Sequence, residues 1–154
     1  CLQSQILVTG SSGACMEMLL QTWSTSKKQR IINSCGLGSM GFAVPASIGI
    51  SVKVPDQSIY CIESDGSFTM SLQELNTIVA KKLNIKLILL DSSGYKSIAL
   101  SQTRLNQHKH GNNAESGLYL PNLLKISEVI GIRTMSVSKS PALRQPFLDY
   151  FQNH

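Results

Sequence analysis

The stretch that decides the fold is residues 58–90, SIYCIESDGSFTMSLQELNTIVAKKLNIKLILL. It opens with a short apolar run, 58–62, that predicts a strand. Apolar residues then recur at helical spacing as far as Lys81 and Lys82, two cations that suit the end of a helix. A second apolar run, 85–90, predicts another strand. Strand, helix and strand in this order predict a βαβ unit with two parallel strands.

The same alternation continues on both sides of this unit. We expect further strands at 5–9, 30–33 and 132–137, and further helices at 16–23, 42–52, 121–130 and 146–151. Alternating strands and helices predict an α/β fold, a Rossmann-like, doubly wound parallel sheet with helices on both faces. The polar stretch 91–117 is long for a compact domain, so it is either partly helical or a functional loop.

Length and composition narrow the class of protein. A chain of 154 residues predicts a single domain, 1–154, and 42% hydrophobic with 15% charged residues is typical of a globular protein. The net charge of +5 is scattered and forms no basic stripe, which argues against nucleic-acid binding. No apolar stretch has the length of a membrane span, and no signal peptide precedes the fold, so we expect a cytoplasmic protein with no membrane contact. Its four well-separated cysteines are expected to be reduced.

Polar residues follow the two strands of the βαβ unit at the point where each strand ends. Asp65 comes just after the first strand and Ser92 just after the second. Parallel strands lie about 4.8 Å apart and end at the same edge of a sheet, so both side chains can share one ligand. The Asp65 carboxylate, the Ser92 hydroxyl and the backbone carbonyl around Gly94 suit Mg²⁺, which completes its octahedron with phosphate oxygens and water.

A segment suited to phosphate lies beside these oxygens. Gly66 and Ser67 precede a helix that is predicted to start near Ser71, and free N–H groups at a helix start attract phosphate. Taken alone, each of these turns is more simply interpreted as an ordinary structural polar turn than as a ligand site. Their joint placement at the ends of adjacent strands indicates a magnesium diphosphate site.

A glycine motif upstream offers a rival interpretation. Residues 36–41, GLGSMG, fit the GxGxxG fingerprint between a possible strand and a helix, and Glu63 follows about 20 residues later. This pattern would make the chain an NAD- or FAD-binding Rossmann domain. Against it, the preceding strand is short and polar, and the fingerprint leaves Asp65 and the Ser92 loop without a role.

Three blocks resemble the C-terminal, diphosphate-binding domain of thiamine-diphosphate (TPP) enzymes of the acetolactate synthase type. They are GLGSMGFAVP at 36–45, DGSFTMSLQEL at 65–75 and LLDSSGY at 89–95. The resemblance is clear from Cys35 to Tyr95 and extends more weakly over most of the chain. The family's magnesium motif begins Gly-Asp-Gly and ends in Asn-Asn or Asp-Asn, whereas this chain has Ser64 and Ser92 at two of these positions.

The resemblance implies TPP and Mg²⁺ as cofactors. Asp65, Ser92 and Gly94 would be the metal ligands, and Met40 would support the bent thiamine from below. The residues that would bind the cofactor are Gly38, Ser39, Met40, Asp65, Gly66, Ser67, Ser92, Gly94 and Tyr95. A serine reaches less far than the family's asparagine, so we expect weaker magnesium binding rather than none.

The resemblance also implies an activity, namely decarboxylation of a 2-oxo acid with carboligation, as in an acetolactate synthase-like transferase or lyase. The family's catalytic Glu belongs to a pyrimidine-binding domain, which no segment here matches, so no catalytic residue is assigned. The chain is expected to be inactive alone, and to be a fragment or one subunit of a homo-oligomeric enzyme that receives this domain from the same or a partner chain. His108 and His110 are more simply solvated loop residues than substrate ligands. A non-catalytic interaction module, with the cofactor site decayed at Ser64 and Ser92, is the alternative.

Overall fold

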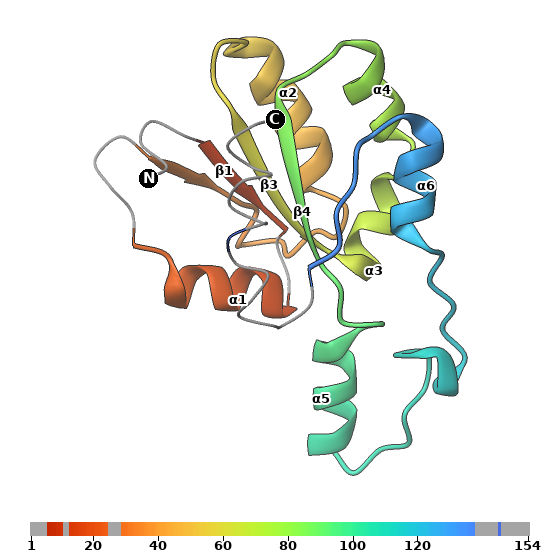
Figure 1. The fold of residues 1–154 in the computed structure, drawn as a ribbon. Coiled ribbons are helices and arrows are strands. Elements are labelled where there is room, and N and C mark those ends of the chain that lie inside the picture. The colour runs from red at the N-terminus through yellow and green to blue at the C-terminus, as the bar shows by residue number, and fades with distance from the viewer. Residues whose placement is uncertain (1–5, 11–12, 25–28, 138–144, 146–154) are drawn as a thin grey trace. The chain divides into compact units, whose positions relative to one another are not determined.

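The strands of the protein form one parallel sheet. The computed structural model describes residues 6–10, 13–24, 29–137 and 145 of the chain. The strands are β1 Ile6–Thr9, β2 Arg30–Ile32, β3 Ile59–Ser64 and β4 Ile85–Leu90, in the spatial order β2-β1-β3-β4 (Figure 1). All three pairings are parallel, which confirms the predicted α/β fold with a doubly wound sheet.

The chain divides into two compact units, Cys1–Pro121 and Asn122–His154. The first unit holds the sheet and the helices α1 Gly13–Thr22, α2 Ala43–Lys53, α3 Asp65–Phe68, α4 Glu74–Ala80 and α5 Lys96–Arg104, with 3-10 turns η1 Thr69–Ser71 and η2 Ala114–Ser116. The chain runs outward from β1 to β2 and then back across β1 to β3. Because parallel crossovers are right-handed, this reversal puts α1 on one face of the sheet and α2 and α4 on the other (Figure 1).

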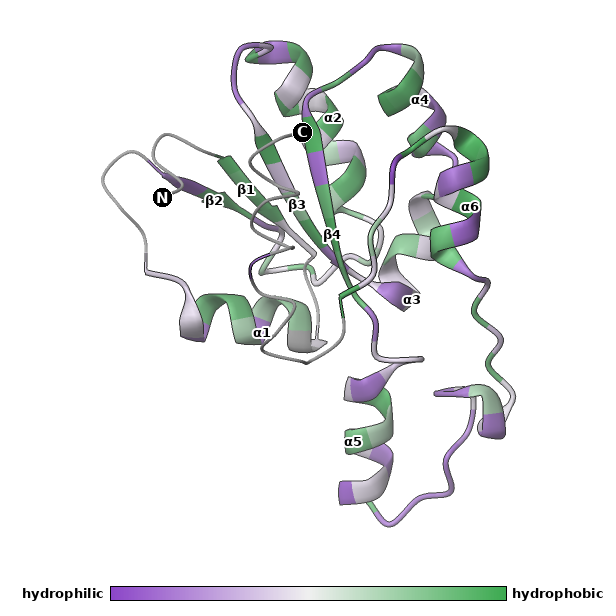
Figure 2. Cartoon of the chain, viewed as in Figure 1, coloured by the Kyte–Doolittle hydropathy of each residue, from purple (hydrophilic) through white to green (hydrophobic). Residues whose placement is uncertain are grey.

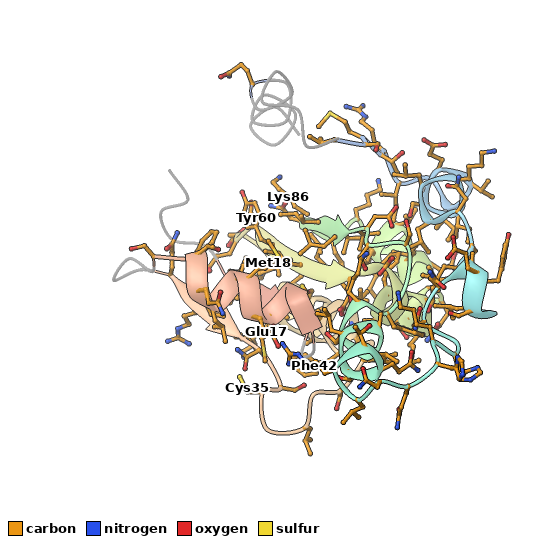
Figure 3. The ribbon with its side chains drawn as sticks, turned by 90° about the horizontal axis from the view of Figure 1, so that it is seen from below. Glu17, Met18, Cys35, Phe42, Tyr60 and Lys86 are labelled. Carbon is orange, nitrogen blue, oxygen red and sulfur yellow. The ribbon has the colours of Figure 1, made fainter. Side chains whose placement is uncertain are left out.

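The core of the first unit is built around β3. Its first five residues are buried, as expected of a central parallel strand that is covered on both faces. The strand segments are mostly apolar, whereas the segment after α5 is mostly hydrophilic (Figure 2). Tyr60 of β3 and Lys86 of β4 are register partners and lie side by side (Figure 3). The buried apolar side chains include Leu7, Val8, Val44, Ile59, Cys61, Phe68, Leu75 and Ile78.

The second unit contains α6, Leu123–Ile130, which ends as the sequence predicts but begins two residues after the predicted start at 121. The Asn122 side chain accepts the Lys125 N–H at 2.9 Å, and Gly131 ends the helix in the left-handed conformation, with φ +100°. The strand predicted at 132–137 is wrong, because these residues form no regular structure. A strand requires a hydrogen-bonding neighbour, which an alternating pattern cannot supply. The helix predicted at 146–151 lies outside the described residues.

The polar stretch 91–117 is partly helical. It contains α5 and the 3-10 turn η2. The irregular part of this stretch is therefore shorter than its polar composition indicates. Within the described residues, no helix combines the length and the apolar content that crossing a membrane requires.

Candidate cofactor-binding site

Asp65 organises the loop that follows β4. Its carboxylate is 3% exposed and lies at the carboxyl end of β3. Oδ2 accepts the backbone N–H groups of Ser92 at 3.1 Å and Gly94 at 2.9 Å, while Oδ1 accepts that of Gly66 at 2.9 Å. The residues that follow two adjacent strands therefore lie together at one edge of the sheet.

The Ser92 hydroxyl lies close to the oxygens of both other candidate metal ligands. The Ser92 hydroxyl oxygen lies 3.3 Å from Asp65 Oδ1 and 2.7 Å from the Gly94 carbonyl oxygen. Adjacent ligands in a magnesium octahedron with bonds of about 2.1 Å are about 3.0 Å apart. The two oxygen–oxygen distances lie on either side of that value, so the residues present fit a magnesium ion. The hydroxyl proton, which points at one of these oxygens here, would have to turn away from the ion.

The charge of the oxygen set also suits magnesium diphosphate. The set contains one carboxylate and two neutral oxygens. In the described part of the chain, no three or more His, Cys, Asp or Glu side chains gather into a metal site. A site with one carboxylate leaves most coordination positions and most of the ionic charge to phosphate oxygens and water, which is how Mg²⁺ is usually bound.

Two glycines allow the segments of this site to pack closely against each other. A Cβ on Gly66 would lie 2.2 Å from Cε1 of Tyr95, so only glycine leaves room for the ring. Gly94 has φ +136°, and a Cβ there would lie 2.1 Å from the Asn112 carbonyl oxygen. That same oxygen accepts the Tyr95 N–H at 2.8 Å. Asn112 therefore shapes the site, although its place in a polar stretch gave no sequence signal.

The prediction that a helix starts near Ser71 is wrong. Helix α3 begins at Asp65 itself, so Gly66 and Ser67 lie within its first turn, and the longer α4 begins only at Glu74. Apolar spacing located the longer helix but not the short turns before it. The Ser67 hydroxyl accepts the Gly41 N–H at 2.8 Å, which ties this turn to the glycine-rich loop.

Gly38, Ser39 and Met40 lie in that loop, and the Met40 side chain is half-buried. The loop follows β2, which is an edge strand. In a dinucleotide-binding fold the fingerprint turn follows a central strand beside the point where strand order reverses. The glycine motif therefore has the residues of the fingerprint without its position in the sheet, which argues against the NAD or FAD interpretation.

Glu63 is a buried residue of this region. The sequence does not reveal its role. Its side chain is fully buried at the end of β3. Oε2 accepts the Ala43 N–H and Oε1 the Ser64 N–H, each at 3.3 Å. Burial raises the pKa of the carboxyl, and hydrogen bonds from Ser67, Ser64 and Ala43 lower it. The sequence connected Glu63 only with the rival dinucleotide motif.

A hollow of about 180 Å³ opens beside the Ser92–Tyr95 loop. Ser92 and Gly94 line one part of it, and Lys96 and Lys109 contribute positive charge. Such a hollow favours an anionic ligand. His108 and His110 are exposed outside the residues that line it, with ring centroids 6.3 Å apart.

The fold and the site together define an α/β domain that presents a magnesium-type oxygen cluster at the carboxyl edge of a parallel sheet. Comparison with known families makes this class specific. The family model described as thiamine pyrophosphate enzyme, C-terminal TPP binding domain, matches residues 11–153. The chain belongs to this family.

Relatives and solved structures agree with the family. Acetolactate synthase 3, chloroplastic, of Brassica napus is 32% identical over 93% of this chain and 23% of its own length. The large subunit of acetolactate synthase isozyme 2 of Escherichia coli is 30% identical over 86% of this chain and 24% of its own. The structure of the thiamine diphosphate-dependent 4-hydroxybenzoylformate decarboxylase of Rhodococcus jostii RHA1 has the same fold, with a TM-score of 0.78 and 20% identity over 97% of this chain and 27% of that one. The chain thus spans about a quarter of the length of these relatives.

Proposed function

We propose that this chain binds the diphosphate of TPP through a magnesium ion held by Asp65, Ser92 and Gly94. The observation that carries the proposal is the spacing of their three oxygens, 2.7 and 3.3 Å, beside a carboxylate that already orders the Ser92–Gly94 loop. Gly66, Ser67 and Tyr95 would complete the diphosphate side of the site, and residues 38–40 would support the thiamine.

The activity we propose is that of an acetolactate synthase-like enzyme, decarboxylation of a 2-oxo acid followed by carboligation. Bound TPP would supply that chemistry, because its thiazolium ring adds to the carbonyl and accepts the electrons left when CO₂ departs. The chain itself would bind and orient the diphosphate. Lys96 and Lys109 add a positive field that favours both anions, the cofactor and the 2-oxo acid.

A pyrimidine-binding domain, from the same or a partner chain, is the partner that we propose for this site. The relatives are about four times longer than the segment matched here, which leaves room for such a domain in each of them. A homo-oligomeric assembly and a cytoplasmic location are further parts of the proposal that rest on the resemblance.

The test is a calorimetric titration of TPP into the purified chain, with Mg²⁺ and again with EDTA. We expect binding that requires Mg²⁺. The Asp65→Asn variant keeps the side-chain shape but removes the charge, and should weaken binding by at least the roughly 10- to 100-fold that loss of even outer partners of metal ligands costs. Asp56→Asn, an exposed aspartate away from the site, is the matched control and should bind as the wild type does.

Other outcomes would decide between the alternatives. Tight TPP binding that is indifferent to both EDTA and Asp65→Asn would disprove the metal site. No TPP binding, even after the pyrimidine-binding domain is added, would favour the interaction module. Saturable NADH binding in a parallel titration would restore the dinucleotide interpretation of residues 36–41.

A further inference from the structure

Glu63 has an environment that stability alone does not explain. Its side chain is fully buried, and Asp and Glu are rarely buried to this extent unless they are paired. Among the described residues, the donors that bond to its carboxyl are the backbone N–H groups of Ala43 and Ser64, both of them neutral. An apolar side chain of similar volume would avoid the cost of removing a carboxyl group from water. The carboxyl is therefore retained at a cost to folding.

The carboxyl joins three segments of the chain. Oε2 accepts the N–H of Ala43 in the first turn of α2, and Oε1 accepts that of Ser64, the residue directly before α3. On the third side lies the turn after β1, where a Cβ on Gly10 would come within 2.0 Å of Oε1. Glycine at position 10 and glutamate at position 63 are therefore complementary in size.

These three segments meet at the point where ligands bind in doubly wound folds. In the strand order β2-β1-β3-β4, the direction of winding reverses between β1 and β3. Ligands bind outside the carboxyl ends of the strands at such a switch point. The Gly10 N–H donates to the Ile62 carbonyl at 2.7 Å, which closes β1 against β3 at the level of Glu63. Glu63 therefore lies at the base of the expected binding crevice.

The Glu63 carboxyl is linked to the candidate site through the end of the glycine-rich loop. Oε2 accepts the Ala43 N–H at 3.3 Å, and two residues earlier the Gly41 N–H donates to the Ser67 hydroxyl at 2.8 Å. Ser67 and the loop before Gly41 are the segments proposed to hold the diphosphate and the thiamine. A shift of the Glu63 carboxyl would move both segments together.

We propose that Glu63 is a positioning residue for the diphosphate cofactor, holding Ser67 and the Gly41–Ala43 segment in the orientation that binds it. The inference rests on the proposed function and deepens it. Glu63 acts through the backbone of Ala43 and Ser64, with no contact of its own with the cofactor.

Two variants test the proposal by changing the same carboxyl in different ways. Glu63→Gln turns one acceptor into a donor, which opposes either the Ala43 or the Ser64 N–H. Gly10→Ala leaves Glu63 in place but displaces the flexible end of its side chain, because the added methyl would overlap Oε1. Each should also lower the melting temperature without TPP, because the group is buried. The proposal predicts that the variants which still fold bind TPP at saturating Mg²⁺ with a Kd about tenfold higher than that of the wild type.

The controls separate positioning from general damage. Glu115→Gln, an exposed glutamate, should leave the Kd for TPP unchanged. The double variant Gly10→Ala with Glu63→Gln should lose less affinity than the sum of the single losses, because both changes act through one group. Wild-type TPP affinity in folded Glu63→Gln and Gly10→Ala would overturn the inference and leave the proposed function standing. Failure of the wild-type chain to bind TPP would overturn both.

Discussion

At the scale of single residues, Ser92 and Gly66 show how closely the candidate site is fitted. The Ser92 hydroxyl lies within hydrogen-bond distance of the Asp65 carboxylate and the Gly94 carbonyl. Two backbone hydrogen bonds also hold the Ser92–Gly94 loop against Asp65. Weaker magnesium binding by serine than by asparagine stays a prediction.

Position 66 requires glycine because the Tyr95 ring lies close to it, and not because of the backbone conformation at position 66. It lies in α3 without a positive φ, yet a Cβ would lie 2.2 Å from the ring. We therefore expect Gly66→Ala to lower the free energy of unfolding by about 1–3 kcal/mol, as overpacking does. Gly49→Ala in α2 is the control, since nothing lies within 4 Å of its added Cβ. Gly49→Ala should raise the free energy of unfolding by about 0.5–1 kcal/mol. Urea unfolding measures both changes, and an equal response would contradict the close ring contact.

At the scale of elements, β3 places the chemistry of the site but is itself a buried, chemically inert strand. Cys61 at its centre is fully buried, and Cys15 of α1 packs against the Ile62 carbonyl at 3.5 Å. Burial raises the pKa of both thiols, that of Cys61 from an ordinary value of 9.0 to about 12. Both should resist alkylation, whereas Cys35 in the glycine-rich segment is exposed.

The raised pKa of Cys61 predicts how stability depends on pH. The unfolded chain loses the thiol proton near pH 9, whereas the folded chain keeps it to about pH 12. The stabilisation by the protonated thiol is thus complete below pH 9 and is lost as the pH rises towards 12, by about 1.4 kcal/mol per pH unit. The difference in unfolding free energy between the wild type and Cys61→Ser should shrink by about 1–2 kcal/mol between pH 8 and pH 10.5. A difference that stays constant over this range would show that the thiol does not ionise on unfolding.

At the scale of the whole molecule, the chain matches about a quarter of its acetolactate synthase relatives. Its carboxyl-edge residues are the ones that we propose to bind and orient the cofactor. The family's catalytic Glu is expected from another domain.

We therefore expect no turnover of pyruvate by the chain alone with Mg²⁺ and TPP, and turnover once the pyrimidine-binding domain is present. CO₂ release measures the reaction. Asp65→Asn in the reconstituted system is the control and should abolish most of the activity. Turnover by the isolated chain would show that the residues needed for the reaction are already present here.

The α/β class, the order of the four observed strands and the polar residues that follow β3 and β4 were predictable from the amino-acid pattern. Strand β4 coincides with the apolar run 85–90, and Gly131 ends α6 as predicted. The blocks around Asp65 and Ser92 were also identified from the sequence. The loops that follow parallel strands emerge at the same edge of the sheet whatever the strand order is, so both blocks were expected at that edge. Local periodicity and turn chemistry are properties of neighbouring residues, so the sequence displays them directly.

Which strands pair, where the winding reverses and which polar groups are buried together became apparent from the folded arrangement. The strand expected at 132–137 did not form, the helix after β3 began at Asp65, and Glu63 and Asn112 became part of the site. Each of these outcomes depends on contacts between residues far apart in the chain. Pairing, burial and close approach are settled by the joint packing of several elements, and no segment carries that information alone.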